Sequence, residues 1–137
     1  MPYDHSFQAK IMSALQQGLA QTLGPVYSGR VYSVTAPPTA TFPLLIYQQQ
    51  DIFGQRTDFL DQNGWTGFMA FRSIDTTQSG AMNKLLSAVQ ALQGLTTMSG
   101  GYSVQITLRT PQQFPIERSS AQTYYTAAVL ADVEIYN

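Results

Sequence analysis

One short segment near the start of this sequence most limits how the chain can fold. Gly29 to Val34 has the composition of a short β-strand, Pro37-Pro38 forms a stiff corner, and Phe42 to Tyr47 indicates a second strand. Pro43 can open that second strand but cannot lie inside it, because proline has no N–H for the sheet ladder. We therefore expect a strand, a corner and another strand, and we expect the two strands to be antiparallel.

Two amphipathic helices are predicted, one before this segment and one after the middle of the chain. Apolar residues at steps of four mark the first helix: Phe7, Ile11, Leu15, Leu19 and Leu23. Gly24-Pro25 is a stop signal, so this helix is expected to run from about Asp4 to Leu23. The second helix is predicted between a cap at Thr76, Thr77 or Ser79 and a stop at Gly94, with a stripe of Met82, Leu85, Leu86, Val89 and Leu92.

Three further segments have the alternation of β-strands. Trp65 to Ile74 carries apolar groups on both faces, which favours a central strand. Tyr102 to Leu108 alternates most regularly, after a turn at Ser99-Gly100-Gly101, and Tyr124 to Tyr136 closes the chain. The order predicts an α+β fold, with a single mostly antiparallel sheet of four to five strands and two helices packed on one face. Residues 1–137 are expected to form one domain.

The composition narrows the classes of function. Charged residues make up 11% of the chain, well under the roughly 25% typical of soluble domains. Neutral polar residues take their place, which suits a protein packed among copies of itself, although it also fits an ordinary uncharged surface. A net charge of -1 with scattered basic residues argues against gripping nucleic acid. The N-terminal residues lack the pattern of a signal peptide, and no membrane span is expected, so synthesis in a cytoplasm is predicted.

No pattern in the chain indicates catalytic chemistry. With His5 as its single histidine and no cysteine, the sequence offers no typical zinc site and no assignable general base. Asp58 and Asp61 have no third acidic residue close by in the sequence, which argues against a calcium loop. Ser99-Gly100-Gly101 precedes a strand and not a helix, so it indicates a turn and not a phosphate cradle. We expect no enzymatic activity, no cofactor and no metal.

The order of elements and several local patterns resemble one family over nearly the whole chain. The patterns are the Leu and Ala repeat of the first helix (Leu15, Leu19, Ala20, Leu23), Gly29-Arg30-Val31-Tyr32, the proline corner, Phe42-Pro43, the helix around Leu85 to Leu92, and the closing strand Tyr124 to Tyr136. With these patterns the chain resembles the tail terminator, or tail completion, proteins of long-tailed bacteriophages.

The resemblance implies a structural role in the virion. Members of that family form a hexameric ring on the last ring of tail tube protein, stop tube growth, and present a surface to the head-side connector. The implied partners are other copies of the chain, the tail tube protein and a head-completion or connector protein. DNA would pass through the ring without specific binding. The implied location is the neck of the virion, reached from the host cytoplasm during assembly.

Two irregular segments are the expected subunit contacts, because both are longer than ordinary hairpin connections and mix apolar with charged groups. They are Asp51 to Gln62 and Pro111 to Ala121. The candidate interface residues are Ile52, Phe53, Arg56, Asp58, Phe59, Leu60, Asp61, Phe114, Ile116, Glu117 and Arg118. The alternative is that these loops fold back on their own subunit.

Three other functions fit the same sequence. A head-closure or connector protein of the neck shares the size, the class and the absence of catalytic patterns. A tail-tube protein fits less well, because of the two helices. From a different class, a small non-viral ligand-binding or inhibitor module would use the uncovered face of the sheet.

Overall fold

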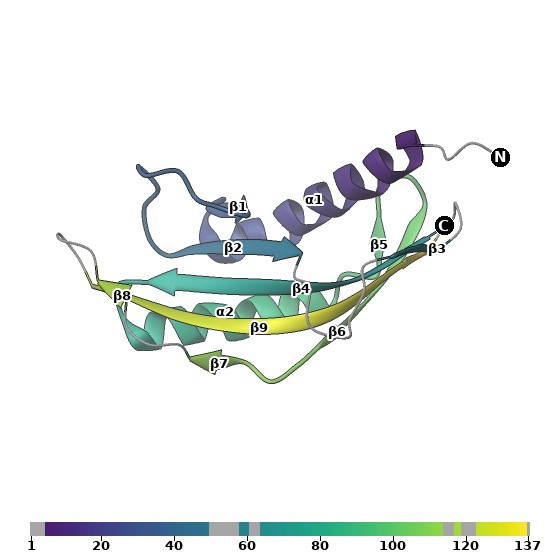
Figure 1. Cartoon of the computed structure of the whole chain (residues 1–137). Helices are drawn as coiled ribbons and strands as arrows, with labels where there is room; N and C mark the ends of the chain where they lie inside the picture. The colour runs from purple at the N-terminus through teal and green to yellow at the C-terminus, as the bar shows by residue number, and fades with distance from the viewer. Residues whose placement is uncertain (1–4, 50–57, 61–63, 114–116, 119–122, 137) are drawn as a thin grey trace.

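The computed structural model describes residues 5–49, 58–60, 64–113, 117–118 and 123–136, which form two helices and a curled sheet (Figure 1). The helices are α1 (His5–Tyr27) and α2 (Gln78–Gln93). The strands are β1 (Val31–Ser33), β2 (Leu44–Gln49), β3 (Asp58–Leu60), β4 (Gly64–Asp75), β5 (Thr97–Met98), β6 (Tyr102–Leu108), β7 (Gln112–Gln113), β8 (Glu117–Arg118) and β9 (Thr123–Tyr136). The predicted α+β class and both helices are confirmed.

The sheet has more strands than the four to five predicted. Six strands follow one another in the order β1-β2-β4-β9-β6-β5, while the short β3 pairs with β4 and the short β7 and β8 pair with β9. Every pairing except one is antiparallel, as expected. The exception is β1 with β2, which are parallel and contradict the predicted antiparallel start. The connection across residues 34–43 is long enough to return the chain to the end of the sheet from which β1 began.

Helix α1 ends later than the Gly24-Pro25 signal predicted. Pro25 lies inside the helix, which continues to Tyr27. The end is set by Ser28 and Gly29, whose φ angles are 54° and 81°. The N–H of Gly29 donates to the carbonyl oxygen of Gly24 at 2.9 Å, which is the bond of a Schellman motif. Tyr27 is fully buried, so its side chain holds this last turn against the core.

Helix α2 begins and ends as predicted. Thr77 is its N-cap, and the side-chain oxygen of Thr77 accepts a bond from the N–H of Gly80 at 3.0 Å. Gly94 is its C-cap. The buried stripe differs from the predicted one, because it consists of Ala81, Leu85, Ala88 and Leu92. Leu86 is 49% exposed and lies outside the core.

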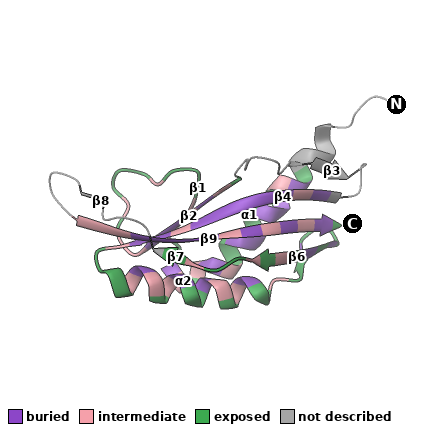
Figure 2. Cartoon of the chain, turned by 60° about the horizontal axis from the view of Figure 1, so that its bottom comes forward, coloured by how far each residue is buried: buried purple, intermediate pink, exposed green. Residues whose placement is uncertain are grey.

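The main core lies between the helices and one face of the sheet. Strand β4 contributes Trp65, Met69 and Phe71 to this core, and the three residues share one face because side chains alternate along a strand. The buried residues form bands along β4 and β9 (Figure 2). Helix α1 contacts β1 at one border of the sheet and β5 at the other. The sheet is therefore curled around α1.

A candidate assembly surface

The two predicted contact segments add short strands to the sheet, which are β3 in the first segment and β7 and β8 in the second. Asp58 pairs with Thr66, and Leu60 pairs with Gly64, so β3 lies beside the first residues of β4. Phe59 is the central residue of β3. Strand β8, which is Glu117 and Arg118, lies beside the first residues of β9. The other predicted contact residues lie outside the described part of the chain: Ile52, Phe53, Arg56, Asp61, Phe114 and Ile116.

The structure places β3 and β8 at opposite ends of the long β4–β9 pair. The register runs from Gly64 opposite Tyr136 at one end to Asp75 opposite Tyr125 at the other. Figure 1 shows the two short strands at opposite ends of this pair. At about 3.3 Å per residue, the register separates them by roughly 30 Å along the sheet. They are thus two separate surfaces. Sequence patterns could not reveal this, because the separation depends on which long strands pair.

The face of the sheet turned away from the helices is partly apolar. Phe68, Ala70 and Ala128 on this face are buried. The guanidinium of Arg109 lies 4.6 Å from the centre of the Phe68 ring, and its Nη2 lies 3.6 Å from Asp132 Oδ2. Both members of this ion pair are about half exposed, so the pair adds little to stability. Arg109 instead covers an aromatic ring on the outer face.

The outer surfaces of both helices are almost free of charge. On α1 from residue 10 onward, Lys10 is the one charged side chain, and on α2 it is Lys84. The exposed uncharged residues of these two stretches are Ser13, Gln16, Gln17, Ala20, Gln21, Pro25, Gln78, Ser79, Asn83, Leu86, Ser87, Gln90 and Gln93. Such a surface gives a phosphate backbone few cations to bind.

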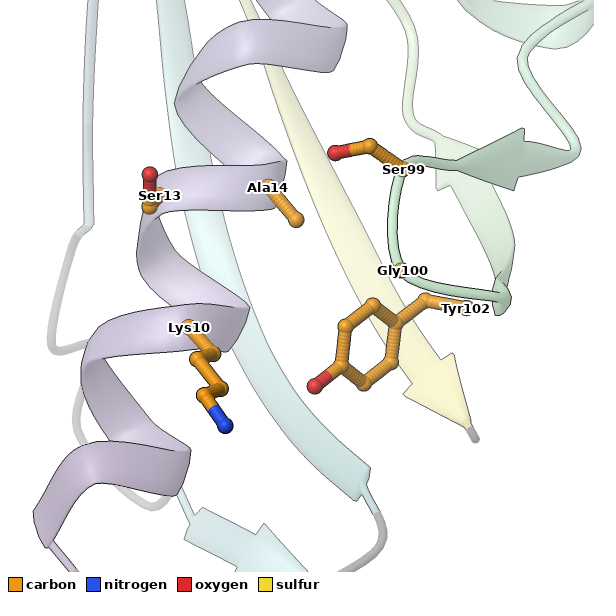
Figure 3. Close-up of a pocket in the computed structure, with 6 residues that line it drawn as sticks. All are labelled: Lys10, Ser13, Ala14, Ser99, Gly100 and Tyr102. Carbon is orange, nitrogen blue, oxygen red and sulfur yellow. The ribbon is translucent and has the colours of Figure 1, made fainter.

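A shallow cleft of about 590 Å³ lies between α1 and the β5–β6 turn. The amine of Lys10 and the hydroxyl of Tyr102 point toward the same space (Figure 3). The hydroxyl of Ser99 donates to Gln17 Oε1 at 3.1 Å and ties the turn to the helix. The turn itself needs its glycines, because Gly100 and Gly101 have φ angles of 86° and 82°. Among the described residues that line it, none is an imidazole, a thiol or a carboxylate.

One titratable group is strongly affected by the core. Burial raises the pKa of Tyr27 to about 12, a bond with the Ser73 hydroxyl opposes the shift, and the charge of Asp75 adds to it. The hydroxyls of Tyr27 and Ser73 are both buried, and they are neighbours that lie too far apart for a short hydrogen bond. Tyr27 is a packing residue at the end of α1.

The described residues contain no cluster of three or more His, Cys, Asp or Glu side chains that would hold a metal ion. His5 is the first residue of α1. Within the same described ranges, neither helix is long and apolar enough to cross a membrane.

Comparison with known proteins identifies solved structures that share this fold. No family model and no curated protein matches the chain. One similar solved structure is a chain of the virion of a native gene transfer agent particle, at 14% identity and a TM-score of 0.57, with 92% of this chain and 97% of that chain covered. A second solved chain has 15% identity and a TM-score of 0.58, with 95% and 96% covered. This chain therefore shares its fold, over nearly its whole length, with a chain of a virion.

Proposed function

We propose that this chain is a non-enzymatic structural subunit of a phage-like virion. Its copies form a ring, of six by the family resemblance, at the head-proximal end of the tail tube. There the ring stops tube growth, joins tail to head and lets DNA pass. The observation that carries this proposal is the fold shared with a virion chain, which extends over 97% of that chain. The sequence resemblance, which rests on separate local patterns, supplies the position in the tail.

The placement of the two contact segments supports a ring. Neighbours in a ring meet head to tail, so each subunit needs two different surfaces on separate sides. Strand β3 at one end of the β4–β9 pair and β8 at the other are two such surfaces. If the two surfaces lay together at one place, they would favour a two-fold dimer instead.

The low charge of the helix surfaces supports passage of DNA without binding. Lys10 and Lys84 are the charged residues on the described outer surfaces of the two helices. Affinity for DNA depends mainly on the number of phosphates that are neutralised. A ring that presents neutral amides and hydroxyls to its channel would release DNA easily.

Removal of the gene from a cell that produces the particle tests this role. A terminator is required to stop the tube, so its loss should give tail tubes of irregular, increased length and heads without tails. Re-expression of the wild-type chain should restore the normal length. Normal tubes that fail to join heads would contradict termination and favour the head-closure or connector role. Normal particles would contradict both roles.

A further inference from the structure

The two borders of the sheet differ in how many backbone groups they leave unpaired. At the β1 border, the N–H of Val31 donates to the Gly29 carbonyl oxygen at 3.0 Å. The Ser33 carbonyl oxygen accepts from the Thr35 N–H at 2.8 Å. These bonds use half of the outward backbone groups of a three-residue strand. The β1 border is therefore partly closed to another strand.

The border formed by β6 is open. The N–H of Arg109 donates to the Leu130 carbonyl oxygen at 2.8 Å, which fixes the phase of the β6–β9 ladder. Because pairing alternates in an antiparallel ladder, the N–H and C=O groups of Ile106 and Leu108 point away from β9. Strand β5 covers this side only at the start of β6. No strand pairing recorded for the described ranges engages Ile106 or Leu108 on that side.

Strand β6 lacks the features that usually protect a free strand. It contains no charged residue and no proline, and its pairing with β9 is unbroken from Ser103 to Leu108. Gln105 and Thr107 are exposed on one face, while Ile106 and Leu108 are half-buried on the other. A neutral strand with β-prone residues and a free edge is a template for another strand.

We propose that the free edge of β6, from Ile106 to Leu108, binds a β-strand of a second copy of this chain. The proposal rests on the ring described above for the assembly in which the copies meet. Strand addition bonds main chain to main chain, so it needs no charged partner. The exposed side chains of Gln105 and Thr107 are neutral, so they do not favour a charged partner strand. With a net charge of -1 per chain, copies repel one another only weakly.

Hydrogen exchange at single amides tests which edge is used. In the dilute monomer, the amides of Ile106 and Leu108 should exchange rapidly, while those of Gln105 and Thr107 should be protected by β9. In the wild-type assembly, formed at high concentration or on tail tubes, Ile106 and Leu108 should also become protected. An assembly in which both amides still exchange rapidly would overturn the proposal, and so would a wild-type chain that stays monomeric in both conditions.

A pair of substitutions at one position isolates the backbone group. Ile106→Pro removes the outward N–H and leaves the bonds to β9 intact, whereas Ile106→Val keeps the N–H with a similar side chain. By native mass spectrometry, Ile106→Pro should weaken assembly about tenfold or more, while Ile106→Val should assemble like the wild type. If Ile106→Pro shows no cooperative unfolding transition, Leu108→Pro against Leu108→Val replaces the pair near the strand end. Folded proline variants that assemble normally would refute strand addition.

The outcomes separate this inference from the proposed function. A ring at the tube end with unprotected Ile106 and Leu108 would overturn strand addition at β6 and leave the function in place. An assembly in which the Ile106 and Leu108 amides are protected but which never binds a tail tube would overturn the proposed function and support strand addition at β6.

Discussion

At the scale of single residues, one tight contact fixes the middle of the sheet. Trp65 and Gly67 lie on the same face of β4, and Trp65 is fully buried. A Cβ atom added at Gly67 would overlap the Trp65 ring. The sequence placed both residues on one face, but it could not show that the ring lies over the glycine, because the rotamer depends on tertiary packing.

Gly67→Ala should therefore destabilise the protein by about 1 to 3 kcal/mol, the usual cost of overpacking a core. The measurement is the free energy of unfolding in urea. In a Trp65→Leu background the same change should cost clearly less, because the ring is gone. An equal cost in both backgrounds would show that the overlap is not its cause.

Tyr27 predicts a pH dependence at the alkaline end. Its pKa is raised to about 12 in the folded protein from 10.0, so between these values the unfolded chain releases the proton first. Stability is then fully present below pH 10 and should fall by about 2 to 3 kcal/mol as the pH approaches 12.

Urea unfolding at pH 8, 10 and 11 should show a shallower loss for Tyr27→Phe than for the wild type. Some loss should remain in the variant, because burial also raises the pKa of Tyr47. Identical pH profiles for the two proteins would show that Tyr27 does not contribute to the loss of stability at alkaline pH.

At the scale of helices and strands, the sequence predicts the elements that are defined by neighbouring residues, such as helix caps and alternating strands. The start and stop of α2 follow from Thr77 and Gly94, and the faces of β4 follow from period-two alternation. The parallel pairing of β1 and β2 could not be predicted, because it depends on the path of residues 34–43. Length and composition indicate the two predicted contact segments, while their separation depends on long-range register.

At the end of α1, alanine substitutions at two glycines should change the stability of the protein in opposite directions. Gly24 lies inside the helix with open space around it, so Gly24→Ala should stabilise the protein by about 0.5 to 1 kcal/mol. Gly29 has a φ of 81°, so Gly29→Ala should destabilise it by about 1 kcal/mol. Thermal unfolding of both variants measures this. The reverse order would mean that the helix ends at Gly24.

The cap of α2 makes a third stability prediction. Thr77→Ala removes the oxygen that accepts the Gly80 N–H and should cost about 1 kcal/mol. Thr77→Ser keeps that oxygen and should cost much less. Comparable losses for the two variants, measured in urea, would mean that the bond does not stabilise the helix.

At the scale of the whole molecule, the account rests on separated surfaces and low charge. A curled sheet carries β3 at one end, β8 at the other, and an open edge at β6. The helices present almost no charge. Together these features suit a subunit that repeats one head-to-tail contact.

Electron microscopy of the purified protein mixed with tail tubes of the same particle tests this account most directly. It predicts a closed ring of copies at one tip of each tube, the head-proximal tip, and tubes that no longer grow when tube protein is added. Tubes with bare tips that keep growing in the presence of excess protein would contradict it.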